Sequence, residues 1–309
     1  MMAAPLVVAH KGASAYRPGN TLAAFDLAIS QGADCIELDV QLTGDGKIVV
    51  HDRWYVQDGE TRRPVIQLPL NVIQQLWSRS HNLNAQRDPP GLLTLPEVLS
   101  HVRPAGIELM IELKNSRLLQ PLSLAQHVID DLTDFAMVSR SYLLSYDHEL
   151  ITAIKSSDVR RGILYVGRLV NITETLRATG ANFIETRNDF LDASFVTRLH
   201  QIGVQICGSS TDDRDEIERL VGLGADMITT NAPDLARRII QETAEGQSGQ
   251  KLIQIAMNAR DDCAVGRFWA QALGWSASGE EPGVTNVEPV GFAYPDPSAM
   301  PSVTALAHP

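Results

Sequence analysis

The feature that most constrains this chain is a regular alternation of short apolar, strand-like runs with amphipathic, helix-like stripes. Eight such units follow one another, with predicted strands at 6–9, 35–42, 107–113, 142–144, 162–166, 182–184, 204–207 and 226–230. Eight strand–helix repeats in roughly 240 residues match the size and order of an α/β TIM (β/α)₈ barrel. An open, doubly wound sheet is the competing architecture, but the sequence lacks the glycine-rich dinucleotide loop that would support it.

Three segments depart from the repeat. The second strand leads into a hairpin turn at 44–46 and a return strand at 48–50. A long polar loop is then expected before the helix that begins near Pro96. We place the barrel at 1–242, because 243–250 has the composition of a linker and 251–309 predicts a small α+β appendage.

Composition excludes several function classes. Lys and Arg total 26 against 37 Asp and Glu, a net charge of −11, which argues against a nucleic-acid partner. With 44% hydrophobic and 20% charged residues the chain reads as an ordinary soluble globular protein, without an integral membrane segment or a secretion signal. Cys35, Cys207 and Cys263 are odd in number and far apart, so we expect no disulfide framework and a cytoplasmic location.

Several side chains capable of chemistry stand at the ends of predicted strands, where a TIM barrel places its active site. They are His10, Glu37, Asp39, His51, Glu112 and Lys114. Three carboxylates meeting at a barrel mouth would repel one another unless a hard divalent cation, Mg²⁺ or Ca²⁺, held them. Two histidines beside that cation supply a general base and a general acid, and lysine supplies positive charge for a phosphate. Together they predict a phosphodiester-cleaving site.

A series of motifs closely resembles the glycerophosphodiester phosphodiesterase family over about residues 5–240. The motifs are HKGAS at 10–14, PGNTLAAF at 18–25, IELDV at 36–40, VHD at 50–52, TLPEVL at 94–99, IELK at 111–114 and ITTNAP at 228–233. The resemblance implies a TIM barrel that hydrolyses glycerophosphodiesters to sn-glycerol 3-phosphate and an alcohol with the help of a metal ion. The predicted partner is therefore a small-molecule substrate.

The resemblance also implies roles for individual residues. By position, Glu37, Asp39 and Glu112 match the metal ligands of the family, and His10 and His51 match its catalytic histidines. The basic residues at positions 11 and 114 match positions that bind the phosphate. We expect His10 to act as the base and His51 as the acid, with either water or a neighbouring substrate hydroxyl as the attacking oxygen.

The chain departs from the family pattern at three places. Lys11 stands where the family has arginine, so the charge is kept but the two-pronged grip on a phosphate is lost. Gly19 replaces a glutamate, and 208–210 (GSS) replaces a tryptophan–threonine pair in the substrate wall. The metal ligands and both histidines are intact, so we expect an active enzyme that is slow or has a shifted specificity.

Two alternatives remain open at this point. The substrate could be a lysophospholipid or a sphingolipid-like head group, which exposed apolar residues at the mouth, such as Trp54, Tyr55 and 68–72, would favour. With Lys11 and Gly19 the barrel could instead bind phosphoesters without turning them over. A panel of head groups and an assay for glycerol 3-phosphate release separate these readings.

The appendage resembles, more faintly, half of a glyoxalase-like module of the vicinal-oxygen-chelate superfamily. The likeness lies in 252–261, in 264–274 and in 283–292. Such modules use two halves per site, so a single half predicts packing or homodimerisation through the tail. Gln254 stands where some relatives have a metal ligand, but we assign it no chemistry.

Overall fold

The computed structural model describes residues 4–81, 91–114, 122–155 and 158–248, and from the C-terminal region residues 271, 276–281 and 284–288. The chain divides into two compact units, Met1–Gly249 and Gln250–Pro309. In the second unit, β12 (Ser276–Glu281) and β13 (Val284–Glu288) form an antiparallel hairpin. Most of the motif that resembles a glyoxalase-like half lies outside the described residues, so the nature of this unit stays a prediction.

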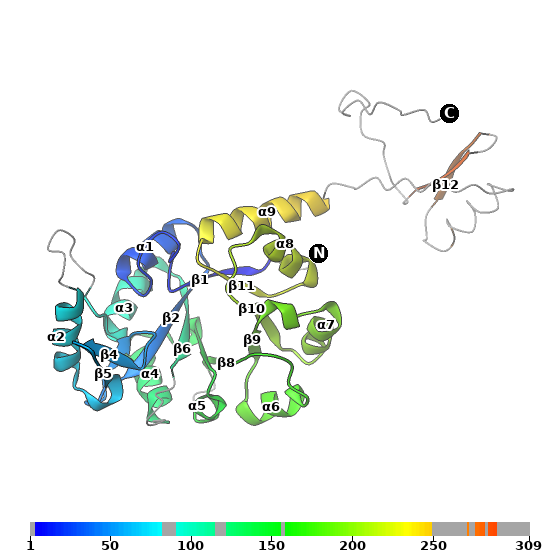
Figure 1. The fold of residues 1–309 in the computed structure, drawn as a ribbon. Helices are drawn as coiled ribbons and strands as arrows, with labels where there is room; N and C mark the ends of the chain where they lie inside the picture. Colours follow the sequence, from blue (N-terminus) through cyan, green and yellow to red (C-terminus); the bar gives the residue numbers. More distant parts are fainter. Residues whose placement is uncertain are drawn as a thin grey trace. The chain divides into compact units, whose positions relative to one another are not determined.

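The first unit is a closed barrel of parallel strands with helices around it (Figure 1). Its strands are β1 (Leu6–His10), β2 (Cys35–Leu42), β6 (Glu108–Leu113), β7 (Ser141–Ser145), β8 (Arg160–Tyr165), β9 (Phe183–Thr186), β10 (Gln205–Gly208) and β11 (Met227–Thr230). Each pairs in parallel with its neighbours, and the β1–β2 and β1–β11 pairs close the ring. The predicted TIM barrel is confirmed.

Helices follow the barrel strands, and several of them begin at capping side chains. The helices are α1 (Leu22–Ser30), α3 (Leu95–Val102), α4 (Ser123–Asp134), α5 (His148–Thr152), α6 (Ile172–Thr179), α7 (Ala193–Gln201), α8 (Arg214–Leu223) and α9 (Pro233–Ser248). Thr21 accepts a hydrogen bond from the Ala24 amide at the start of α1. Thr94 and Glu97 form a reciprocal capping box at the start of α3. None of the helices among the described residues is both long and apolar enough to span a membrane.

Apolar side chains fill the middle of the barrel. This inner cluster consists of Val8, Cys35, Met110, Tyr142, Leu144, Leu164, Phe183, Cys207 and Met227, all nearly inaccessible to solvent. Because strand residues alternate in direction, the next inward positions toward the carboxyl ends of the strands lie directly beyond this cluster. The packed middle therefore leaves the carboxyl ends of the strands as the place for polar, reactive groups.

Residues 51–81 form an excursion from the barrel after the second barrel strand and its return strand, and their structure differs from the predicted polar loop. The return strand β3 (Ile48–Val50) pairs with β2 as expected. The chain then forms the hairpin of β4 (Tyr55–Asp58) and β5 (Thr61–Pro64), followed by helix α2 (Leu70–His81), so the loop prediction was wrong. Leu70, Ile73 and Trp77 recur at helical spacing and carried this signal.

These elements bury a small core of their own. Its buried members are Val49, Val56, Val65, Leu68, Ile73, Leu76 and Leu92, with Leu70, Val72 and Trp77 packed against it. Trp54 and Tyr55 are only partly exposed. The apolar side chains that were expected to line an exposed lipid-binding mouth are thus largely used to stabilise the excursion.

Close packing at Gly162 gives a test of the barrel interior. A Cβ added there would lie 2.2–2.6 Å from three ring atoms of Phe183, its partner on the neighbouring strand. We expect Gly162→Ala to lower the free energy of unfolding by about 1–3 kcal/mol, because the ring must leave its rotamer. Denaturant unfolding followed by circular dichroism measures this change.

Gly222 provides the matched control. It is an exposed residue of helix α8 with no atom within 4 Å of an added Cβ. Gly222→Ala should leave the free energy of unfolding unchanged or raise it by up to about 1 kcal/mol. Equal stability of the two variants would show that the Phe183 ring does not pack against the backbone of β8.

Candidate active site

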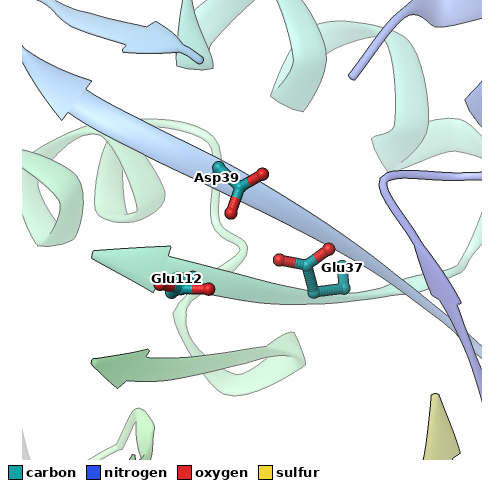
Figure 2. Close-up of side chains that lie close together, drawn as sticks. All are labelled: Glu37, Asp39 and Glu112. Carbon is teal, nitrogen blue, oxygen red and sulfur yellow. The ribbon is translucent and has the colours of Figure 1, made fainter. Parts of the chain in front are cut away.

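Three carboxylates converge at the carboxyl ends of two adjacent strands (Figure 2). Glu37 and Asp39 are two residues apart on β2 and therefore project from the same side of the strand. The parallel register pairs Asp39 with Glu112 on β6. One oxygen from each of the three lies within 4.8 Å of the others, so these residues are placed as the sequence predicted.

Burial and mutual repulsion shape the charge of this group. Glu37 and Asp39 are only 4% and 1% exposed. Desolvation, and then the neighbouring carboxylates, raise the pKa of Glu37 well above its usual range, and burial also raises the pKa of Glu112. Burial alone would raise the pKa of Asp39 as well, but the ammonium groups of Lys114 and Lys11 outweigh it and lower that pKa.

Two lysines neutralise part of the negative charge. Lys114 Nζ lies 2.8 Å from Asp39 Oδ1 and 2.7 Å from Glu112 Oε1. Lys11 Nζ lies 3.2 Å from Asp39 Oδ2 and 3.0 Å from Asp52 Oδ2. These carboxylates outweigh the desolvation of the ammonium groups and raise the pKa of both lysines, so both remain charged. The mouth thus holds fixed positive charge beside its acidic group.

The donor set fits a hard divalent cation. Asp39 Oδ1 is buried and accepts no well-aligned hydrogen bond, although Lys114 lies close to it. The other oxygen, Oδ2, accepts a hydrogen bond of 3.0 Å from Asn20 Nδ2, which fixes the plane of the carboxylate. This oxygen is therefore held by an ion pair rather than by an aligned hydrogen bond, and oxygen donors that converge on one point are the ligands that Mg²⁺ and Ca²⁺ prefer.

His10 ends β1 and is held by a chain of polar contacts. Its Nδ1 lies 2.8 Å from Asn231 Oδ1, and Asn231 Nδ2 donates to Asp212 Oδ2 at 3.0 Å. Since the amide oxygen accepts, Nδ1 carries the proton and Nε2 has a free lone pair, which faces Glu37 Oε2 at 4.0 Å. Desolvation lowers the pKa of His10, which favours this neutral form.

His51 follows β3 and is 7% exposed. Its Nε2 donates a hydrogen bond of 3.0 Å to the Tyr55 carbonyl oxygen, so Nδ1 is the nitrogen left for chemistry. Nδ1 lies 3.8 Å from Asp52 Oδ1, and the ring packs edge-on against Trp77 with centroids 5.2 Å apart. Desolvation lowers the pKa of His51. The excursion that was predicted as a loop therefore positions this histidine.

The loop after β1 brings two of the three departures from the family pattern together, Lys11 and Gly19. Lys11 and Gly12 both have positive φ, 58° and 81°, and the Lys11 amide donates to Glu37 Oε2 at 3.0 Å. A Cβ at Gly12 would lie 2.7 Å from the Ala24 backbone, so only glycine fits there. A Cβ at Gly19 would lie 2.9 Å from the Lys11 Cβ. Gly19 thus leaves room for the stem of Lys11.

Four residues of the site were not predicted from the sequence. Asn20 and Asn231 fall within recognised motifs, but nothing in the motifs says that they bond Asp39 and His10. Asp212, which supports Asn231, and Glu185, an inward residue of β9, carry no motif signal. Each takes its place only through contacts between residues distant in the sequence.

The altered wall after β10 forms a hollow at the rim. Ser209 Oγ donates a hydrogen bond of 3.3 Å to Asn188 Oδ1, and Asn188 Nδ2 donates to the Ser209 carbonyl at 3.0 Å. A cavity of about 480 Å³ lies here, lined by Arg187, Asn188, Asp189, Ser209, Glu216 and Arg219. Its arginines pair with Asp189 and Glu216, so the hollow is polar and nearly balanced in charge.

Comparison with solved structures shows the same fold. The chain is similar to a glycerophosphoryl diester phosphodiesterase from Silicibacter pomeroyi, described as putative, with a TM-score of 0.69 and 19% identity over 78% of this chain and 94% of that one. It is also similar to a phosphodiesterase from Oleispira antarctica in complex with the product sn-glycerol-3-phosphate. That match has a TM-score of 0.66 and 21% identity over 77% of this chain and 97% of the other.

Sequence comparison places the chain in a family. It is 28% identical over 243 residues, 77% of this chain and 98% of the relative, to a glycerophosphodiester phosphodiesterase of Caldanaerobacter subterraneus. It is 43% identical over 103 residues, 32% of this chain and 38% of the relative, to a probable glycerophosphodiester phosphodiesterase 1 of Mycobacterium tuberculosis. The family model matches residues 10–235. This family match, together with the barrel and the acidic group at its mouth, shows that the chain belongs to the glycerophosphoryl diester phosphodiesterase family.

Proposed function

We propose that this protein is a phosphoric diester hydrolase that converts glycerophosphodiesters to sn-glycerol 3-phosphate and an alcohol with a bound divalent cation. The observation that carries the proposal is the meeting of Glu37, Asp39 and Glu112 at the mouth of a family barrel, with His10 and His51 at the same mouth. Release of glycerol 3-phosphate from glycerophosphocholine is the direct assay. Binding without release would support the non-catalytic reading instead.

The three carboxylates are the proposed ligands of the cation, which we take to be Mg²⁺ or Ca²⁺. When bound, such a cation supplies Lewis-acid stabilisation of charge on phosphoryl oxygens. Asn20 holds Asp39 in place, and the Lys11 amide holds Glu37. Lys11 and Lys114 place two ammonium groups where they can bind the phosphate and stabilise the additional charge of an in-line transition state.

We assign the base to His10 and the acid to His51. Asn231 keeps the proton of His10 on Nδ1, so that Nε2 can accept a proton from the attacking oxygen. On His51 the Tyr55 carbonyl binds the Nε2 proton, so the imidazolium that acts as the acid would carry its transferable proton on Nδ1, where the Asp52 carboxylate offsets part of the desolvation that lowers the pKa of the ring. Proton transfer to the leaving alkoxide then comes from Nδ1.

The lipid head-group alternative gains no support from the excursion, where its expected apolar residues are largely packed into a core. A panel of glycerophosphodiesters, lysophospholipids and sphingolipid head groups separates the two readings.

A cytoplasmic location is proposed from the buried, unpaired thiols of Cys35 and Cys207. Homodimerisation through the C-terminal unit remains a prediction, and the size of the protein in solution tests it.

Removing either histidine tests the acid–base assignment. We expect His10→Ala and His51→Ala each to lower kcat for glycerophosphocholine by about a hundredfold or more, because a positioned proton donor or acceptor contributes that much. Steady-state release of glycerol 3-phosphate measures the effect. The partly exposed His127 on α4 provides a control, and its alanine variant should keep wild-type activity. Near-normal rates in either test variant would remove the assignment.

Asn231→Ala tests whether the orientation of His10 matters. The variant removes the acceptor of the His10 Nδ1 proton, so we expect kcat to fall by about 10- to 100-fold while KM changes little. Asn188→Ala, in the segment that follows β9, is the matched control and should retain kcat. A change confined to KM would mean that Asn231 binds substrate rather than positions His10.

Metal removal tests the role of the acidic group. Dialysis against EDTA should abolish turnover, and added Mg²⁺ or Ca²⁺ should restore it. Asp39→Asn should raise the metal concentration for half-maximal activity by at least about tenfold, because it removes a charged oxygen ligand. Full activity in the presence of excess EDTA would contradict the proposed metal dependence.

A further inference from the structure

Glu185 is a fourth carboxyl group on the inner wall of the barrel, and the mechanism above leaves it without a role. Phe183, two residues earlier on β9, belongs to the inner apolar cluster, whereas Ile184 packs outward against the helices. Side chains alternate in direction along β9, so Glu185 points into the barrel. It is the next inward-facing residue after Phe183 in the direction of the mouth. Its register partners are Leu164 on β8 and Cys207 on β10, both inner-cluster residues.

The carboxyl group faces the proposed active centre. Glu112 and Asp39 lie close enough to raise its pKa, and Lys114 lies close enough to lower it, with burial the largest influence; the net result is a pKa of about 8. Tyr146, which follows β7 and is 58% exposed, interacts electrostatically with Glu112, Glu185 and Lys114. Glu185 and Tyr146 thus border the same side of the mouth, beyond Lys114.

Glu185 is a half-buried acid with weak partners. Within the part of the chain that the structure describes, no basic side chain forms an ion pair with it, and the Cys207 thiol, which contacts the Gly208 carbonyl oxygen and Thr229 Oγ1, is its register partner on β10. The nearest ammonium group, that of Lys114, is already paired with Asp39 and Glu112. A half-buried carboxyl group on the inner wall of a barrel, with no basic side chain to neutralise it, is costly to the fold, and such groups concentrate at ligand-binding sites.

The chemistry of the substrate indicates what this group binds. The phosphate is attracted to Lys11, Lys114 and the cation, so the polar features left in the glycerol phosphate part are its hydroxyl groups. A carboxyl group accepts a hydrogen bond from a hydroxyl group in either protonation state, and donates one when protonated. We propose that Glu185 is a specificity-determining residue that hydrogen-bonds a hydroxyl group of the glycerol moiety. This inference rests on the proposed function.

Binding of product analogues tests the assignment without requiring turnover. Isothermal titration calorimetry in MgCl₂ compares sn-glycerol 3-phosphate with propyl phosphate, which keeps the phosphate and lacks both hydroxyl groups. The wild-type protein should bind glycerol 3-phosphate more tightly. Glu185→Leu should weaken glycerol 3-phosphate binding by about 10-fold, the value of one or two hydrogen bonds, and change propyl phosphate binding less than about twofold.

Two further variants sharpen the comparison. Glu185→Gln keeps a donor and an acceptor, so its affinity for glycerol 3-phosphate should stay within about threefold of wild type. Glu60→Leu, at the exposed turn between β4 and β5, is the control for the same substitution elsewhere and should change neither affinity. Equal weakening of both ligands by Glu185→Leu, or no weakening of either, would overturn the assignment.

Thermal unfolding without ligand separates a binding role from a structural one. If Glu185 serves the ligand, both of its variants should melt at or above the wild-type temperature, because they remove a poorly partnered, half-buried acid. A clear drop for Glu185→Gln would show a structural role and overturn the inference. Failure of the wild-type protein to bind glycerol 3-phosphate at all would contradict the proposed function and this inference with it.

Discussion

The electrostatic repulsion among three buried carboxylates is the constraint on which the rest of the site depends. Glu37, Asp39 and Glu112 crowd into one region where solvent screens them poorly. Two ammonium groups reduce this repulsion, and the pKa of Glu37 stays well above its usual range because of desolvation first and the neighbouring carboxylates second. A protein retains such an arrangement when a cation completes it, which is why the acidic group, rather than any single residue, defines the chemistry.

The surrounding fold orients the reactive atoms instead of adding new charges. Asn20 and Asn231 are neutral amides, and each fixes one functional group, the Asp39 carboxylate and the His10 ring. The excursion after β3 has a similar role, since a backbone carbonyl from β4 sets which nitrogen of His51 is protonated. Both histidines are therefore prepared before a substrate binds, and this preorganisation lowers the cost of reaching the transition state.

The barrel and the acidic group could be predicted from the sequence because both depend on short-range periodicity. Alternation puts residues 37 and 39 on one side of a strand, and eight repeats bring their carboxyl ends to one mouth. The His10–Asn231 contact joins residues 221 positions apart, and no local pattern identifies it. The excursion was missed for a different reason, since its helical stripe was present but interspersed with polar residues.

The central claim is that one divalent cation is shared by the three carboxylates, and anomalous diffraction tests it most directly. A crystal soaked in MnCl₂ should show a manganese peak bounded by oxygens of Glu37, Asp39 and Glu112, since Mn²⁺ accepts the same oxygen ligands as Mg²⁺. A fully occupied peak elsewhere, or an acidic mouth that stays free of manganese at saturating concentration, would contradict the account.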